Sequence, residues 1–159
     1  MRKFDYLGLH LAEYQARIFE ESIVRYNCSS LVFLRRFKKS NLAKRLDNAN
    51  NNVLLDINEA FLEMNSQYKE TSYGKEKYSK EAMFWAGYIY RYFCYTRECT
   101  TLLAFDFIKP QELLKLYYVC HTQSEEYTIR YIFELHNYDE NVFDKDYQTK
   151  QFYKNRMAN

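Results

Sequence analysis

The chain has 159 residues, of which 28% are charged, and its 23 lysines and arginines nearly balance 21 aspartates and glutamates to a net charge of +2. This length suits one domain with a single hydrophobic core. The near balance of charge excludes the strongly basic composition of proteins that bind nucleic acid mainly through its phosphates. We interpret the one dense basic cluster as a solvated helix face; it comprises Arg35, Arg36, Lys38, Lys39, Lys44 and Arg45.

Two further features of the composition bear on fold and location. With only three glycines and one proline, the chain lacks the turn residues that β-rich and dinucleotide-binding folds need, so helices with few breaks are expected. The N-terminal residues reach Glu13 before any continuous apolar segment develops. They therefore predict neither a signal peptide nor a membrane span, and we expect a cytoplasmic protein that does not enter a membrane.

The four cysteines form no C-x-x-C pair, and their spacing does not match a zinc ribbon or finger. Buried free thiols are the simpler interpretation, so we expect no metal and no cofactor. The cysteines are Cys28, Cys94, Cys99 and Cys120.

Hydrophobic periodicity along the chain predicts helices almost throughout. Ser79 and Ser124 are placed to cap two of them, as is Ser29 or Ser30 for another, and Pro110 suits a first helical turn. We predict an all-α bundle of six or seven helices without a sheet, in one domain over residues 1–136, followed by a tail or short helix over 137–159. The segments considered for these helices, some of them short, are 5–26, 31–39, 42–49, 55–68, 80–97, 99–107 (a short helix or a turn), 110–121 and 125–135.

The stretch FWAGYIYRYFCYT, residues 84–96, holds seven aromatic residues. A helix that is apolar nearly all round is typically central, and Gly87 within it suggests the close approach of another helix backbone. Four tyrosine hydroxyls and Arg91 nevertheless need hydrogen-bond partners or water. Both a purely structural core helix and a core helix with a functional rim remain open, because tyrosine, tryptophan and arginine also anchor protein interfaces.

Few residues indicate catalysis. Arg130 and His136 are similar to the loose Arg-x(4–6)-His pattern of helical HEPN-type ribonucleases, in which a dimer brings two such motifs together, although Tyr131 stands where those enzymes usually have a polar residue. His121 lies at the predicted end of a helix, where a histidine commonly interacts with the last carbonyls.

Two segments, SKEAMFWAGYIYRYFCYT and LLKLYYVCHTQSEEYTIRYI, together resemble a family of small helical proteins from low-GC Gram-positive bacteria that pair a W-x-G-Y-I-Y-R-Y helix with a later H-T segment. The later segment also resembles very small proteins encoded beside ADP-ribosyltransferase-like toxins. The resemblance implies an all-helical fold and an antitoxin-like or immunity role exerted by binding a toxin. The matching positions are Trp85, Gly87, Tyr88, Tyr90, Arg91, Tyr92, His121 and Thr122.

We therefore expect a binding protein rather than an enzyme, with a toxin, such as an ADP-ribosyltransferase-like protein, as its partner. The ribonuclease interpretation is the alternative, and a homodimer is left open. The predicted partner surface lies where the 80–97 helix meets the end of the helix that starts at Pro110. Its residues are Tyr88, Arg91, Tyr95, His121 and Thr122.

Overall fold

The computed structural model describes residues 1–49, 54–69, 72–140, 149 and 156–157. Within these residues the chain forms nine α-helices and no strand, which confirms the predicted all-α class with a somewhat higher helix count. In chain order they are α1 (Tyr6–Arg25), α2 (Ser30–Phe37), α3 (Asn41–Asp47), α4 (Ile57–Gln67), α5 (Lys80–Arg97), α6 (Thr101–Phe107), α7 (Pro110–Lys115), α8 (Tyr117–Cys120) and α9 (Glu125–Leu135).

Most helices begin where a short polar side chain caps the first turn. The hydroxyls of Ser29, Ser79 and Ser124 accept hydrogen bonds from the backbone N–H three residues later, as an N-cap does. Pro110 occupies the first turn of α7. These predicted starts are confirmed, and α5 and α9 have the bounds expected from the periodicity.

The prediction of a single helix over residues 110–121 is wrong. α7 ends at Lys115, and Leu116 (φ −78°, ψ −8°) separates it from α8. The N–H of Leu116 bonds to the carbonyl of Leu113 at 3.0 Å, three residues back, which is the tighter 3₁₀ spacing. The continuous α-helix is therefore interrupted at this residue.

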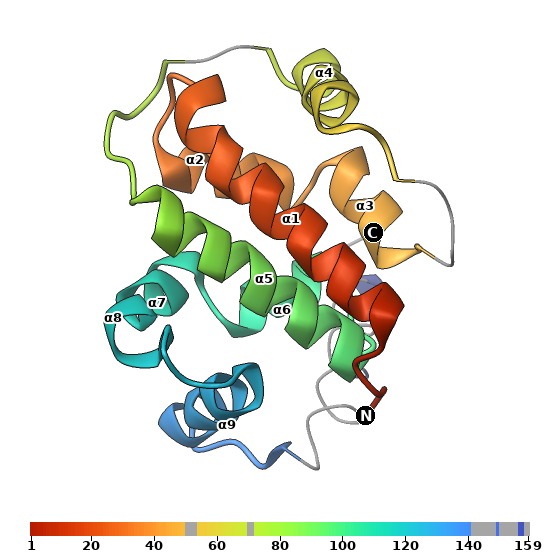
Figure 1. Cartoon of the computed structure of the whole chain (residues 1–159), viewed down its shortest axis with the longest axis vertical. Coiled ribbons are helices and arrows are strands. Elements are labelled where there is room, and N and C mark those ends of the chain that lie inside the picture. Colours follow the sequence, from red (N-terminus) through yellow and green to blue (C-terminus); the bar gives the residue numbers. More distant parts are fainter. Residues whose placement is uncertain (50–53, 70–71, 141–148, 150–155, 158–159) are drawn as a thin grey trace.

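Two long antiparallel helices, α1 and α5, form the centre of the molecule (Figure 1). They meet closely at Gly87, where an added Cβ would lie 2.9 Å from the Cα of Ala16 and 2.9 Å from the carbonyl oxygen of Gln15. Real Cβ atoms do not approach backbone atoms so closely, so this crossing requires glycine. The predicted close approach of a helix at Gly87 is confirmed, and the neighbour is α1.

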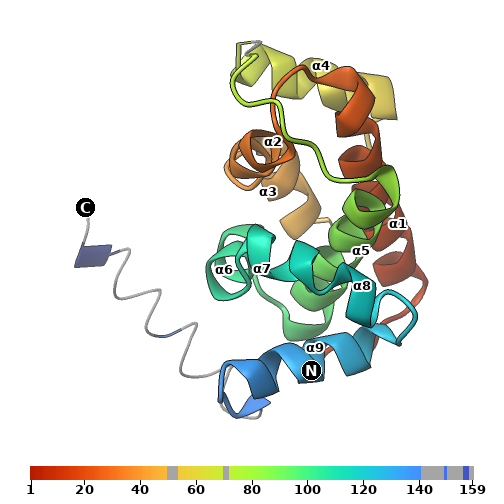
Figure 2. The same ribbon diagram turned by 90° about the vertical axis from the view of Figure 1, so that its left-hand side faces the viewer.

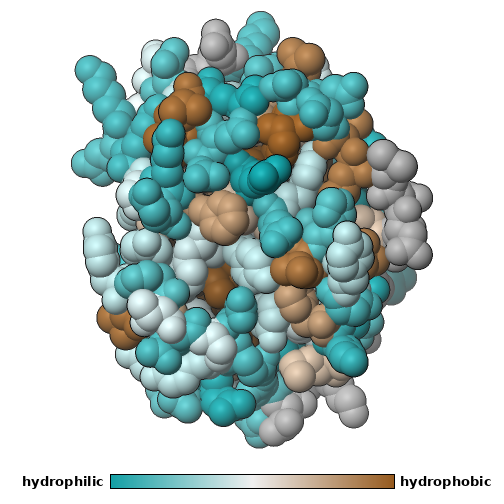
Figure 3. Space-filling view, in the orientation of Figure 1, coloured by the Kyte–Doolittle hydropathy of each residue, from teal (hydrophilic) through white to brown (hydrophobic). Residues whose placement is uncertain are grey.

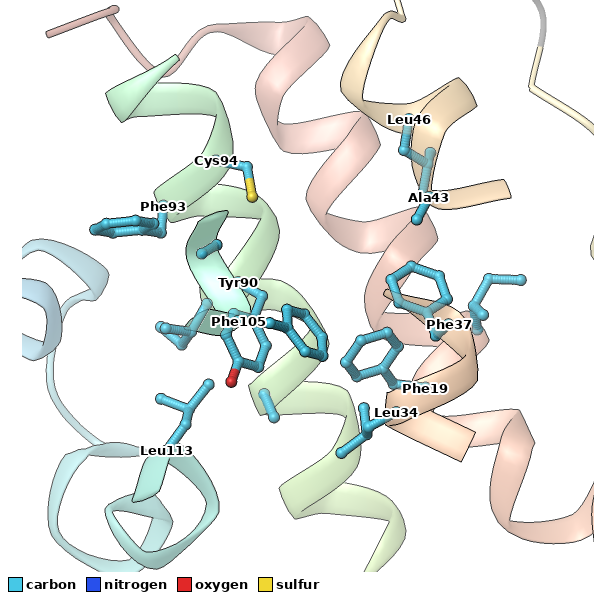
Figure 4. Close-up of a cluster of buried hydrophobic side chains, with 14 of the residues drawn as sticks. Phe19, Leu34, Phe37, Ala43, Leu46, Tyr90, Phe93, Cys94, Phe105 and Leu113 are labelled. Carbon is cyan, nitrogen blue, oxygen red and sulfur yellow. The ribbon is translucent and has the colours of Figure 1, made fainter. Parts of the chain in front are cut away.

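A second layer covers one side of this pair. Figure 2 shows α1 and α5 on one side of the molecule and α2, α3, α6 and α7 on the other, with α4 and α9 at opposite ends. The core fills the space between the layers (Figure 4). In it, Tyr90 stacks on Phe105 with ring centroids 4.0 Å apart, and Phe19 meets Phe37 edge to face at 4.8 Å.

The first residues after α9 pack against the bundle. The Tyr138 ring lies 5.9 Å from that of Phe107, and Glu140 pairs with the buried guanidinium of Arg97. The rest of the predicted tail lies largely outside the described residues, so the domain boundary at 136 stays a prediction. None of the helices in the described residues is long and apolar enough to span a membrane.

Candidate functional site

The structure does not bring the five predicted partner-binding residues to one rim. Arg91 and Tyr95 are buried, with 2% and 6% of their surface exposed. Tyr88 is half-buried, whereas His121 and Thr122 are exposed beyond the end of α8. The expected rim is therefore divided between a buried polar network and a surface, and the two have different chemistry.

Arg91 is the centre of the buried network. Its Nε donates to Gln15 Oε1 at 2.8 Å, one Nη donates to Asp47 Oδ1 at 2.8 Å, and the other donates to the Thr101 hydroxyl at 2.7 Å. Gln15 in turn donates to the carbonyl of Gly87, the residue at the helix crossing. This network joins α1, α3, α5 and α6. The Arg91 guanidinium has a partner at every nitrogen, so the role of Arg91 in the structure is to hold four helices together.

Asp47 completes this network from the end of α3. Besides Arg91, its carboxylate accepts the backbone N–H of Thr101 at 3.0 Å and the Thr101 hydroxyl at 2.7 Å. The carboxylate therefore neutralises a buried cation and also satisfies a backbone donor in the first turn of α6.

The tyrosine hydroxyls of α5 have separate partners. Tyr90 donates to the carbonyl of Ile108 at 2.5 Å inside the core, and Tyr92 donates to Glu126 at 2.9 Å. Tyr95 donates to Asp5 at 2.5 Å, and this hydrogen bond lowers the pKa of the Asp5 carboxyl. For these three residues the structure favours the core interpretation over a functional rim.

Tyr88 differs from the other three tyrosines. Its hydroxyl has no hydrogen-bond partner among the described residues, and partial burial raises its pKa to about 12, with smaller contributions from the charges of Glu125 and Glu13. The ring meets that of Phe4 edge to face at 6.3 Å. A half-buried phenol that remains neutral at physiological pH and has a free hydroxyl is suited to donate a hydrogen bond to a partner.

Other aromatic side chains connect α5 with α8. Trp85 lies one helical turn before Tyr88 on the same side of α5, and its ring centroid is 5.7 Å from that of Tyr117. Tyr117 stacks on His121 at 4.6 Å and touches Tyr118 at 5.4 Å. We call Trp85, Tyr88, Tyr117, Tyr118 and His121 the aromatic surface.

The outer part of the aromatic surface is freely accessible. Tyr118 is 84% exposed and its neighbour Val119 is 59% exposed. His121 Nδ1 lies 2.8 Å from the carbonyl oxygen of Tyr117, so its ring is held by the end of the helix, as expected. On the face drawn in Figure 3, pale side chains of intermediate hydropathy gather over the region of α5 and α8 among hydrophilic ones.

The residues of the alternative ribonuclease interpretation also have clear positions. Arg130 is exposed on α9, and His136 follows the end of that helix. His136 Nε2 lies 2.5 Å from Glu112 Oε1, and the imidazole packs on Phe107 with centroids 4.9 Å apart. The described residues contain no group of three or more His, Cys, Asp and Glu side chains that could hold a metal ion.

No family model, curated protein or solved structure matches this chain.

Sequence reasoning identified Trp85, Tyr88 and His121 within the aromatic surface but missed Tyr117 and Tyr118. The signal that could have indicated them was the adjacent pair of tyrosines in the sequence. This segment was interpreted as one continuous helix, and the pair was not assigned to the site. In the structure Tyr117 lies between Trp85 and His121, and Tyr118 is exposed. Helical periodicity alone did not show that α5 would supply Trp85 as a neighbour of Tyr117.

Proposed function

We propose that this chain is an antitoxin-like protein that neutralises a toxin by binding it directly through the aromatic surface. The observation that carries the proposal is the exposure of Tyr118, at 84%, beside the contacting rings of Trp85, Tyr117 and His121. Tyrosine and tryptophan dominate the energetics of protein interfaces because they bury a large apolar area and lose little conformational entropy.

The surroundings of the aromatic surface suit docking better than catalysis. His121 is held by a backbone carbonyl, and a catalytic histidine would need a carboxylate or similar group to orient it. Thr122 is exposed next to it, where it supplies a hydroxyl for the polar rim of an interface. The toxin as partner is supported by the resemblance of residues 79–96 and 113–132 to antitoxin-like proteins.

The test is co-expression with the product of the neighbouring gene, which the proposal expects to be the toxin, combined with a measured dissociation constant for the purified pair. Tyr118→Ala is expected to weaken binding at least about tenfold and to reduce protection of the cells, because truncating an anchoring aromatic residue costs on the order of 2 kcal/mol. His121→Ala and Thr122→Ala are expected to weaken binding less.

Tyr6 provides the matched control, because it is also 84% exposed but lies at the start of α1. Tyr6→Ala is expected to change the dissociation constant by less than about twofold, as most surface truncations outside a hot spot do. Equal affinity of the Tyr118→Ala and wild-type proteins would refute the aromatic surface as the binding site. Absence of any complex with the toxin would refute the antitoxin role.

A second candidate function is a ribonuclease that uses Arg130 and His136. The observation in its favour is the close pair of His136 and Glu112, since a carboxylate can orient a histidine and stabilise its charged form. The purified protein would then cleave RNA. His136→Ala would abolish cleavage with the helical content unchanged, whereas an unaffected rate would exclude His136 as the catalytic base.

A further inference from the structure

The four cysteines are all buried, but two of them lie together at the end of α5. After Arg97 the chain enters the left-handed region at Glu98 (φ 51°, ψ 43°), and the carbonyl of Cys94 accepts the N–H groups of both Glu98 and Cys99. The second bond, at 3.0 Å, is the 6→1 bond of a Schellman motif. This motif brings the side chains of its first and sixth residues into contact, here Cys94 and Cys99.

Hydrogen bonding to Cys94 raises the pKa of the Cys99 thiol, in keeping with this contact. The backbone bond between the same two residues also holds their Cα atoms close, which is the first requirement for a disulfide. Cys28 and Cys120 differ from this pair, because the contacts found for them are with other kinds of side chain: Cys28 lines a small cavity with aromatic rings, and Cys120 hydrogen-bonds to Thr128.

A surface pocket of about 320 Å³ is lined by both cysteines. Cys94 and Cys99 are only 3% and 9% exposed, and this pocket gives a reagent a route to them. Its charged lining comprises the cations Arg2, Lys38, Lys44 and Arg91 and the anions Asp47 and Glu98. The lining thus has an excess of two positive charges, which raises the local concentration of small anions.

We propose that Cys94 and Cys99 are a redox modification site, in which an anionic low-molecular-weight disulfide enters the pocket and converts the two thiols to a reversible intrachain disulfide. The Cys94 thiolate attacks one sulfur of the small disulfide, forming a mixed disulfide and releasing one small thiolate. Cys99 then loses its proton and attacks the Cys94 sulfur, releasing the second small thiolate. The protein loses two electrons and two protons, and the small disulfide is reduced to two thiols.

The order of the two attacks follows from the surroundings of Cys99. Its hydrogen bond to Cys94 and its burial raise the pKa of the Cys99 thiol, with Asp47 raising it further and Arg91 opposing the shift. Cys99 therefore stays protonated at neutral pH, and it acts second, as the resolving thiol. We therefore assign the first attack to Cys94 and the resolving attack to Cys99.

The test uses folded, fully reduced protein incubated with glutathione disulfide, which carries carboxylates. After acid quenching, free thiols are blocked with N-ethylmaleimide and the protein is digested with trypsin, which cuts after Arg97, between the two cysteines. We expect peptides 92–97 and 98–115 to be joined by a disulfide, at a rate at least about tenfold above any modification of Cys28 or Cys120, because Cys94 and Cys99 lie together in one pocket.

Variants separate the two steps. Cys99→Ser is expected to stop at a glutathione adduct on Cys94, whereas Cys94→Ser is expected to leave Cys99 largely unmodified; Cys28→Ser is the control and should behave as wild type. Lys44→Gln and added salt are expected to slow the reaction several-fold with glutathione disulfide but not with the uncharged hydroxyethyl disulfide.

Two results would overturn the proposal. The first is that peptides 92–97 and 98–115 stay unlinked, or link no faster than Cys28 or Cys120 reacts, in protein whose circular dichroism is unchanged. The second is that charge on the reagent, salt and Lys44→Gln all leave the rate unaltered, which would exclude the cationic pocket as the entry site for an anionic oxidant.

Discussion

Removing the carboxylate of Asp47 is expected to be among the most destabilising single changes at a polar residue of this protein. Arg91 is 2% exposed, and its ion pair with Asp47 has an N–O distance of 2.8 Å. Asp47→Ala leaves this guanidinium buried without its counter-charge, and it also removes the acceptor for the N–H and hydroxyl of Thr101. Breaking a buried ion pair from one side costs about 3–5 kcal/mol.

That cost is a large fraction of the about 5–15 kcal/mol by which a domain is stable. Urea unfolding followed by circular dichroism measures it directly, and the thermal midpoint is expected to fall by about 6–20 °C for a chain of this size. Arg45→Ala is the control, since the pair of Arg45 and Glu63 has the same 2.8 Å distance but is exposed, with 47% and 23% of the side chains accessible. It is expected to cost at most about 1 kcal/mol.

The double variant Arg91→Met, Asp47→Leu tests the reason for the effect. If an unpaired buried charge causes the loss, replacing both partners with apolar side chains of similar volume should recover most of the stability. A cost below about 1 kcal/mol for Asp47→Ala, equal to that of the exposed control, would refute the view that this network holds the helices together.

Three further changes give expected shifts in the free energy of unfolding, each measured by urea titration. Gly87→Ala should destabilise by about 1–3 kcal/mol despite the better helix propensity of alanine, because its Cβ meets the backbone of Ala16; a gain in stability would contradict the close crossing. Tyr90→Phe should cost about 1–3 kcal/mol, because the buried carbonyl of Ile108 loses its donor, and an unchanged value would mean that water replaces the hydroxyl. Glu98→Gly should stabilise by about 1 kcal/mol, because φ is 51° there; a loss would show that the glutamate side chain outweighs the backbone strain.

The helices could be predicted from the sequence because their signals are local. Ser79 and Ser124 cap the first turns of α5 and α9, and apolar residues recur at helical spacing behind them. The division of residues 110–121 at Leu116 could not be predicted in this way. No proline or glycine marks that position, so no local signal separates α7 from α8.

The site was predicted less well, because helical periodicity tells which residues share a face but not which face a neighbour covers. Tyr88, Arg91 and Tyr95 do lie on one side of α5, yet α1 covers the last two and leaves Tyr88 half-exposed. The counter-charge of Arg91 is 44 residues away in the sequence. Its identity depends on how α3 docks, and a single sequence carries no information on that pairing.

The antiparallel pairing of α1 and α5 also has a consequence for synthesis on the ribosome. Gln15 and Gly87, which meet at the crossing, are separated by 72 positions in the chain. At about 5–20 residues per second, α1 emerges about 4–14 s before the residues that cover it. During this interval the apolar side chains of Leu11, Ile18 and Phe19 lack their principal partner, so nascent chains that have not yet reached α5 are the form most exposed to chaperones and proteases.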